Sequence, residues 1–338
     1  MSHPKSYIAY RFEEVGGPLK RTEVEWKDPE EGQVTVKVLA CGVCASDEVV
    51  KYQAMPTGFP RIPGHEIVGE VVAVPSSEKV WKVGDRVGSG WHGGHCHVCK
   101  ACSCGDFIMC EKENINGILS DGGYAEYATL RTEALLSVPT DMDPAEVAPL
   151  LCAGITTFNS LRNMSIQPPE IVAVQGIGGL GHLALQFSRA MGYHTIALSS
   201  SGSKRDLSMQ LGADEYIDTS AENVTKALTS RGGAKVIIVT APSPKVLDEL
   251  LPALAVDGTL LLLALMPQKA ELDLTAMIGK RSSIRGWPSG TAKDSAACVE
   301  FAKSRGVRCM VQTFPLDKAQ EAYDHRSSAR FRSVIVPN

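Results

Sequence analysis

The chain has 338 residues, more than a single hydrophobic core usually holds, so two domains are expected. Hydrophobic residues at 44% and charged residues at 21% are typical of a soluble globular protein, and a net charge of −4 provides no basic stripe for nucleic acid. No apolar run is long enough to span a bilayer, and the N-terminus lacks the apolar core of a signal peptide. We therefore expect a cytoplasmic protein with no nucleic-acid or membrane partner.

The first 150 residues are predicted to be rich in β-strands. Short β-branched runs at 34–39 and 67–74, and shorter ones at 83–87 and 125–129, are separated by Gly and Pro. This pattern predicts a compact barrel or partly open β-domain.

A group of chemically active side chains, two of them potential zinc ligands, lies within this β-rich part. Its members are Cys44, Ser46 and Asp47, followed about twenty residues later by His65 and Glu66. Cys and His are ligands that zinc prefers, and a catalytic zinc takes three protein ligands and keeps one position open. Cys152, in an apolar run, is the best candidate for the third ligand.

Each of these residues has a simpler interpretation. Cys152 could be a small buried hydrophobe, and His65 alone could be a core histidine. Ser46 could cap a helix that begins at Asp47. The combination of two thiols, an imidazole and a carboxylate favours the metal site.

A cluster of four cysteines predicts a structural zinc site. Its members are Cys96, Cys99, Cys102 and Cys110, the first three separated by two residues each. Four thiolates close a tetrahedral site and exclude water, so this site would stabilise a lobe without doing chemistry. Cys104 is the spare thiol, His95 and His97 are alternative ligands, and an iron–sulfur cluster is the competing interpretation.

From about residue 167 the pattern changes to alternating strands and helices, which predicts a parallel, doubly wound α/β sheet. A buried strand at 170–175 leads into Gly176-Ile-Gly-Gly-Leu-Gly181 and then a helix at 182–191. This strand–turn–helix unit is typical of dinucleotide binding. Further strands are expected at 195–198, 235–239, 259–264 and 283–286, and helices at 204–211, 245–255 and 292–303. A final strand at 332–336 is expected to return to the β-rich first part.

The cofactor is predicted to be NADP(H) rather than NAD(H). No Asp or Glu occurs between His182 and Arg205, where NAD-binding proteins usually carry an acid for the ribose. The second strand of the unit ends instead in Ser199, Ser200 and Ser201, followed by Lys204. Hydroxyl groups and a cation suit the 2′-phosphate of NADP(H). The competing interpretation is a solvated polar loop.

Taken together, these motifs resemble the zinc-dependent alcohol dehydrogenases of the medium-chain dehydrogenase/reductase superfamily, and the Ser-Ser-Ser-x-x-Lys loop resembles their cinnamyl alcohol dehydrogenase-like branch. The resemblance implies a GroES-like catalytic domain at 1–152, with a structural zinc lobe at about 92–112. It also implies a Rossmann domain at 153–287, and a segment at 288–338 that completes the Rossmann sheet and returns to the catalytic domain.

The resemblance also implies roles for individual residues. Cys44, His65 and Cys152 would hold the catalytic zinc and the four lobe cysteines the structural zinc, two ions per chain. Ser46 would reach the substrate oxygen, Asp47 would support His65, and Glu66 would lie near the metal. The cofactor would contact Gly176, Gly178, Gly179, Leu180, Gly181, the serine–lysine loop and Arg332, and the substrate pocket would include Met55, Trp91 and Trp287. Many relatives carry a histidine where this chain has Val49, so a proton relay must end elsewhere.

The leading hypothesis is an enzyme that transfers a hydride between NADP(H) and an alcohol/carbonyl pair. A reductase of C=N or C=C bonds is the second hypothesis, and a catalytically silent nucleotide-binding protein is the third. The resemblance implies a small-molecule substrate and a homodimer or homotetramer.

Overall fold

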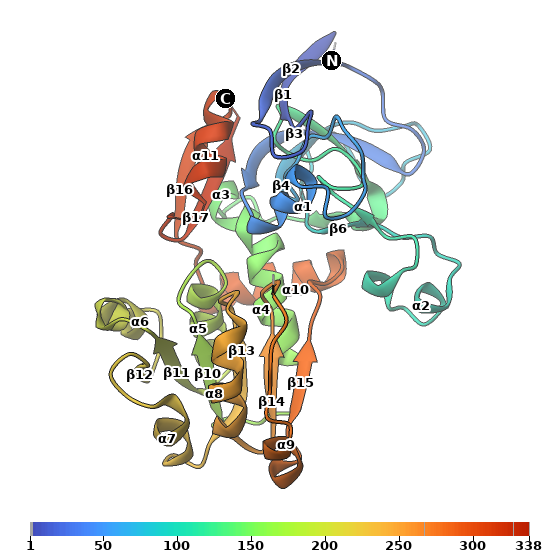
Figure 1. The fold of residues 1–338 in the computed structure, drawn as a ribbon. Helices are drawn as coiled ribbons and strands as arrows, with labels where there is room; N and C mark the ends of the chain where they lie inside the picture. Colours follow the sequence, from blue (N-terminus) through green and yellow to red (C-terminus); the bar gives the residue numbers. More distant parts are fainter. Residues whose placement is uncertain (1–2, 267, 327, 338) are drawn as a thin grey trace. The chain divides into compact units, whose positions relative to one another are not determined.

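The computed structural model describes residues 3–266, 268–326 and 328–337, and the chain separates into two compact units (Figure 1). The first unit comprises Met1–Ile155, Ser289–Lys303 and Arg308–Asn338. The second comprises Thr156–Pro288 and Ser304–Val307. Among the described residues, no helix has the length and apolar character that a membrane crossing requires.

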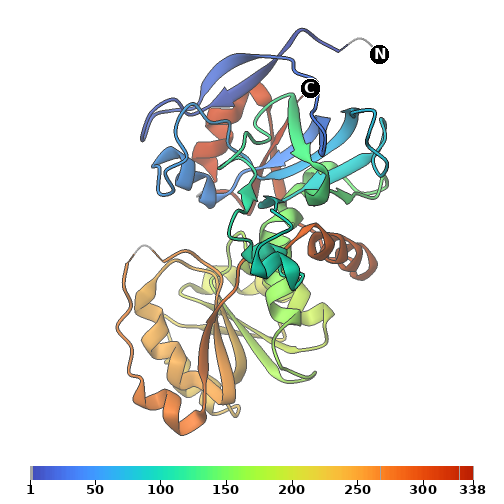
Figure 2. The same ribbon diagram turned by 90° about the vertical axis from the view of Figure 1, so that its right-hand side faces the viewer.

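The first unit is built around a mixed sheet with the strand order β16-β17-β3-β4-β5-β9, and β8 also pairs with β3. The bounds are β3 (Gln33–Gly42), β4 (Glu66–Ala73), β5 (Arg86–Ser89), β8 (Tyr127–Arg131), β9 (Leu136–Ser137), β16 (Val311–Pro315) and β17 (Arg332–Val336). β17 runs antiparallel to β3, with Ile335 opposite Cys41. Figure 2 shows the C-terminal segment (red) among the N-terminal strands (blue) of this unit.

Two small two-stranded sheets and several short helices complete the first unit. They are β1 (Ser6–Arg11) with β2 (Lys20–Glu25), β6 (His92–Gly94) with β7 (Asn114–Ile115), and α1 (Glu48–Lys51), α2 (Lys100–Ser103), α3 (Pro144–Val147) and α11 (Ala319–His325). The core contains the alternating valines Val34, Val36 and Val38 of β3, all fully buried. Since alternate residues of a strand point to the same face, these valines place one face of β3 against the core.

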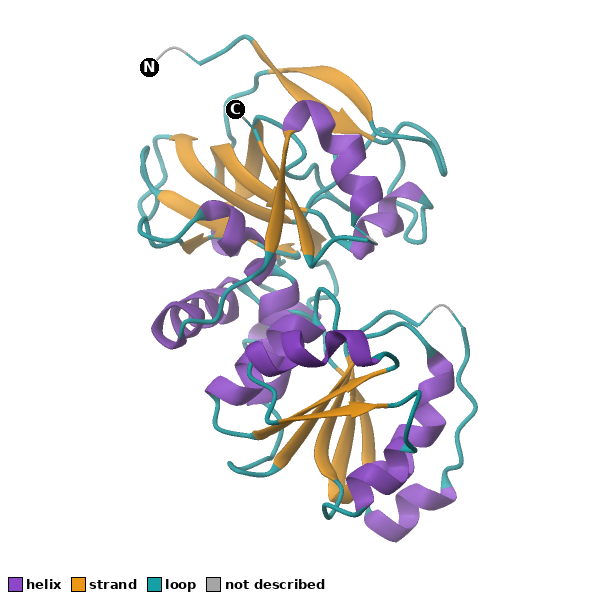
Figure 3. Ribbon diagram, turned by 90° about the vertical axis from the view of Figure 1, so that its left-hand side faces the viewer, coloured by secondary structure: helices purple, strands orange, loops and turns teal. Residues whose placement is uncertain are grey.

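The second unit contains an all-parallel sheet with the order β12-β11-β10-β13-β14-β15. Its strands are β10 (Ile171–Gln175), β11 (His194–Ser199), β12 (Glu215–Asp218), β13 (Ala234–Val239), β14 (Leu254–Leu262) and β15 (Ser283–Gly286). The helices of this region include α5 (Gly181–Ala190), α6 (Arg205–Gln210), α7 (Val224–Thr229), α8 (Leu247–Leu250) and α9 (Thr275–Lys280). Figure 3 shows helices on both faces of the sheet.

This order is that of the Rossmann fold, in which the chain winds outward in two directions from the pair β10 and β13. The predicted combination of a β-rich part and a doubly wound parallel sheet is confirmed. Two further helices each contain a boundary between the units along the sequence. They are α4 (Ala153–Arg162) and α10 (Ala292–Arg305).

Two predictions were wrong, and one strand of the parallel sheet was missed. The segment 288–338 was expected to complete the Rossmann sheet, but β15 is the last strand of that sheet, and β16 and β17 belong to the sheet of the first unit. The helix expected over 245–255 is broken into Pro244–Val246, α8 and Leu251–Ala253, the outer two being 3-10 turns. Pro252 lacks a backbone N–H and cannot continue an α-helix. Strand β12 was not predicted, because Glu215-Tyr-Ile-Asp218 holds only two apolar residues. Tertiary pairing with β11 makes it a strand.

Candidate metal centres and nucleotide-binding turn

Three predicted ligands come together within the first unit although they are distant in sequence. Cys44 lies directly before a 3-10 turn at Ala45–Asp47, His65 directly before β4, and Cys152 directly after a 3-10 turn at Ala148–Leu151. Cys44 Sγ lies 3.9 Å from Cys152 Sγ, and His65 Nε2 lies 3.3 Å from that same sulfur. The ligand atoms of these three residues and Glu66 all lie within 4.8 Å of one another.

These separations suit a tetrahedral zinc site. With Zn–S near 2.3 Å and Zn–N near 2.0 Å, ligand atoms at the corners of a tetrahedron lie about 3.4–3.8 Å apart. The Cys152 thiol lies in hydrogen-bond contact with Cys44, which lowers the pKa of Cys44 and raises that of Cys152. The two thiols therefore share a proton, and binding of a metal cation by both sulfurs would release it. The donor set fits zinc.

Asp47 connects the two metal-binding segments. Its Oδ2 accepts the backbone N–H of Cys44 at 3.0 Å, and its Oδ1 lies 3.2 Å from His65 Nδ1. Ser46 is half-buried beside Cys44 and donates its backbone N–H to Cys44 Sγ. α1 begins after Asp47 without a side-chain cap, so the simpler interpretation of Ser46 as its capping residue does not hold.

Glu66 and Arg332 form a buried ion pair that sequence reasoning missed. Arg332 begins β17, and its guanidinium contacts Glu66 Oε1, while Glu66 Oε2 is buried without a partner among the described residues. Burial raises the pKa of Glu66 to about 7, with Arg332 acting in the opposite direction. Arg332 was predicted to contact the cofactor; in this structure its side chain faces Glu66.

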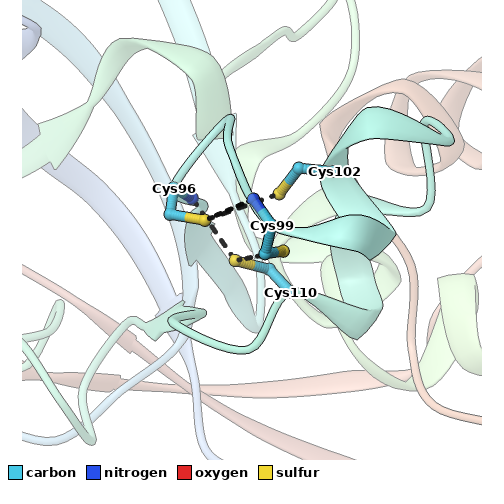
Figure 4. Close-up of side chains that lie close together, drawn as sticks. All are labelled: Cys96, Cys99, Cys102 and Cys110. Carbon is cyan, nitrogen blue, oxygen red and sulfur yellow. Dashed lines mark hydrogen bonds between the residues drawn. The ribbon is translucent and has the colours of Figure 1, made fainter.

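The cysteine lobe brings its four predicted ligands together around one point (Figure 4). Cys96 Sγ lies 4.0 Å from Cys102 Sγ, and Cys99 Sγ lies 3.9 Å from Cys110 Sγ. Backbone N–H groups donate to the sulfurs of Cys96 and Cys110. Those of Cys102 and Glu111 lower the pKa of the Cys99 thiol to about 6. This stabilises thiolate, the form that binds metal. The set fits a closed four-sulfur zinc site.

The other candidates in the lobe lie outside that group. Cys104 is exposed, which agrees with its interpretation as the spare thiol. His95 is stacked on Phe107 with ring centroids 4.0 Å apart, and its Nδ1 hydrogen-bonds His92 Nε2. His97 is exposed. The alternative histidine ligands are thus outside the sulfur cluster.

Of the predicted pocket residues, Trp91 and Met55 lie in the first unit and Trp287 in the second. The Trp91 ring meets the His65 imidazole edge to face, with centroids 5.2 Å apart. Met55 is half-buried against the core of the first unit. The Arg285 guanidinium lies over the Trp287 ring.

The glycine-rich turn joins β10 to α5 in the second unit. Gly176 adopts a φ of +87°, and a Cβ on Gly181 would lie 1.9 Å from the Gly176 carbonyl oxygen, so both positions require glycine. Thr240, directly after β13, donates its hydroxyl to the carbonyls of Gln175 and Gly176, at 2.9 and 2.7 Å. Sequence reasoning missed Thr240, since no motif marks it.

The serine–lysine loop lies next to this turn. Lys204 donates its ammonium group to the carbonyl of Ile177 at 3.0 Å, which links the two loops. Ser199 is buried at the end of β11, whereas Ser200 and Ser201 are exposed. The Arg205 guanidinium lies over the Tyr216 ring. Hydroxyl and cationic groups therefore gather beside the turn that would hold a pyrophosphate.

Comparison with known proteins agrees with this arrangement. Residues 30–140 match the family described as "Alcohol dehydrogenase GroES-like domain", and residues 179–304 match "Zinc-binding dehydrogenase". The alcohol dehydrogenase patD of Penicillium expansum is 47% identical, with 98% of each chain covered. A probable cinnamyl alcohol dehydrogenase of Populus deltoides is 33% identical, covering 98% of this chain and 96% of that protein. A Helicobacter pylori CAD structure complexed with NADP(H) is 25% identical, has a TM-score of 0.88 and covers 98% of each chain.

The fold and these matches define a zinc-binding dehydrogenase with a GroES-like domain. More particularly, the chain belongs to the zinc-dependent alcohol dehydrogenases of the medium-chain dehydrogenase/reductase superfamily, in the cinnamyl alcohol dehydrogenase-like branch. It is an oxidoreductase of the alcohol/carbonyl type, so the leading functional hypothesis is confirmed at this level.

Proposed function

We propose that this alcohol dehydrogenase uses NADP(H) and two zinc ions per chain, and that Cys44, His65 and Cys152 hold the catalytic ion. The convergence of these three side chains, with ligand atoms within 4.8 Å, is the observation that carries the proposal. Three ligands leave a fourth position for the substrate oxygen. The four lobe cysteines would hold the second, structural ion.

The chain's own residues supply position and proton transfer. Bound zinc provides Lewis acidity toward an alcohol or carbonyl oxygen, and bound nicotinamide provides or accepts the hydride. Asp47 orients the His65 imidazole so that Nε2 faces Cys152. The Ser46 hydroxyl exchanges a proton with the substrate oxygen. Val49 packs against the core and cannot extend that relay, so the proton leaves through other groups.

The preference for NADP(H) is supported by the loop at 199–204 and by the NADP(H) complex of the Helicobacter pylori relative. Lys204 and the serine hydroxyls would bind the 2′-phosphate, and no acidic residue between His182 and Arg205 would repel it. In Lys204→Ala, kcat/KM should fall much more with NADPH than with NADH. Lys226→Ala, an exposed lysine on α7, is the matched control. Equal use of both cofactors by the wild type would contradict the preference.

The zinc assignment is tested by metal analysis and turnover together. Wild type should hold two zinc ions per chain, and Cys44→Ala should lose one of them together with carbonyl reduction. Cys104→Ala, which removes an exposed thiol outside both clusters, should keep both. Full activity of Cys44→Ala, or of chelator-treated protein without zinc, would refute the assignment.

Product analysis with an α,β-unsaturated aldehyde separates the two enzymatic hypotheses. An allylic alcohol is expected from carbonyl reduction, whereas a saturated aldehyde would indicate C=C reduction. Absence of turnover over a broad carbonyl panel would instead favour the silent nucleotide-binding protein. The proposed cytoplasmic homodimer or homotetramer is checked by sedimentation of the purified protein and by localisation in cells.

A further inference from the structure

Tyr124 is a fully buried residue between β7 and β8 that contacts the segment carrying His65. Its backbone N–H donates to the carbonyl of Pro63 at 3.2 Å. Its ring packs directly on Gly64, where an added Cβ would lie 2.4 Å from the ring. The tyrosine therefore lies against the backbone immediately before His65.

The hydroxyl of the same tyrosine contacts the carboxylate that faces His65. Tyr124 Oη donates to Asp47 Oδ2 at 2.7 Å, and that oxygen also accepts the backbone N–H of Cys44 at 3.0 Å. The other oxygen, Oδ1, lies 3.2 Å from His65 Nδ1. Two donors thus fix the rotation of the carboxylate, and one of them is the phenol.

We infer that Tyr124 is a positioning residue for the three-ligand metal site: it acts through Asp47 to fix the orientation of the His65 imidazole. This inference rests on the proposed zinc function. A carboxylate with a single donor can rotate, and a rotated carboxylate no longer presents Oδ1 to Nδ1. Mutation of a group that supports a metal-bound histidine commonly lowers metal affinity by about 10–100-fold.

Tyr124→Phe removes the hydroxyl and keeps the ring, and Tyr323→Phe is the matched control. Tyr323 is 1% exposed, and its hydroxyl has no hydrogen-bond partner among the described residues. In a competition with a chelator, Tyr124→Phe should lose one zinc per chain at about tenfold lower chelator concentration, while the second ion stays. Tyr323→Phe should behave as wild type.

Cobalt substitution supplies a readout that does not depend on turnover. The visible spectrum of cobalt at the three-ligand site should change in Tyr124→Phe, because the imidazole is reoriented, and should be unchanged in Tyr323→Phe. Unchanged zinc retention and spectrum in Tyr124→Phe would overturn the inference, and so would equal changes in both variants.

A double variant tests the route through Asp47. If Tyr124 acts only through that carboxylate, Asp47→Asn/Tyr124→Phe should retain zinc as Asp47→Asn does. Additive losses of zinc would overturn the inference, because they would mean that Tyr124→Phe acts independently of Asp47, for example through a general folding defect. A wild type that holds no zinc at this site would instead refute the proposed function, so the two failures are distinguishable.

Discussion

The guanidinium of Arg332 and the carboxylate of Glu66 pair inside the first unit, with side-chain exposures of 9% and 0%. The two residues are 266 positions apart, and their contact joins the start of β17 to the start of β4. A buried ion pair of this kind is costly to break, because removing one partner leaves an uncompensated charge in a dry environment.

Arg332→Gln should therefore lower the free energy of unfolding by about 3–5 kcal/mol, measured by urea denaturation. Lys303→Gln is the control: it breaks a pair with Asp141 in which the side chains are 46% and 65% exposed, and should cost less than about 1 kcal/mol. Equal effects in the two variants would show that burial does not determine the cost.

What could be predicted from the sequence was local. The lobe cysteines lie within fifteen positions of one another, so their spacing alone indicates a closed sulfur cluster. The glycine turn is likewise a short motif between a strand and a helix. Cys152 was found by the demand for a third ligand, although it lies 108 positions from Cys44.

The contacts that could not be predicted join residues that are far apart in the sequence. Tyr124 meets Asp47 across 77 positions, and Thr240 meets the glycine turn across 64. Neither Tyr124 nor Thr240 belongs to a spacing pattern that would predict such a contact. The burial of Arg332 was missed for the same reason, since a charged residue at a strand start usually faces solvent.

The lobe cysteines predict coupling between metal and stability. Cys99→Ser should release one zinc per chain and lower the melting temperature by at least about 5 °C, because metal binding energy contributes to folding. Cys104→Ser, in the same lobe but exposed and outside the cluster, should change neither. Differential scanning fluorimetry with zinc analysis measures both quantities. An unchanged melting temperature in zinc-depleted Cys99→Ser would contradict a structural role.

A surface network in the second unit predicts acid sensitivity. Glu215 binds Arg231 and His194, each at 2.8 Å, and these hydrogen bonds lower the pKa of Glu215 below its ordinary 4.5. Folding therefore favours the ionised form, and its stabilisation is complete above about pH 4.5 and lost as pH falls through the lower folded pKa.

Glu215→Gln should accordingly cost up to about 1 kcal/mol at pH 7, a small value because the partners are about one-third exposed. The difference from wild type should shrink as pH falls below 4.5. Urea midpoints between pH 3 and 7 measure it, with Glu222→Gln, an exposed glutamate, as the control. A difference that grew toward low pH would reverse the assigned sign.

Thr240 predicts a cofactor effect that does not depend on the 2′-phosphate. Its hydroxyl holds the carbonyls of Gln175 and Gly176, so Thr240→Val frees the glycine turn while keeping the side-chain shape. The hydroxyl has one proton, which the two carbonyls share, so its loss costs about 1 kcal/mol and should weaken NADPH and NADH binding alike, by about threefold to tenfold.

The common effect separates Thr240 from Lys204, whose removal should act mainly on NADPH. Fluorescence titration with each cofactor measures both dissociation constants. Thr240→Ser, which keeps the hydroxyl, should restore wild-type binding, and Thr259→Val, which removes a hydroxyl paired with Ser283 elsewhere in the same sheet, should leave it unchanged. A loss confined to NADPH in Thr240→Val would assign this threonine to phosphate recognition instead, because a loosened glycine turn cannot discriminate between two cofactors that share the same pyrophosphate.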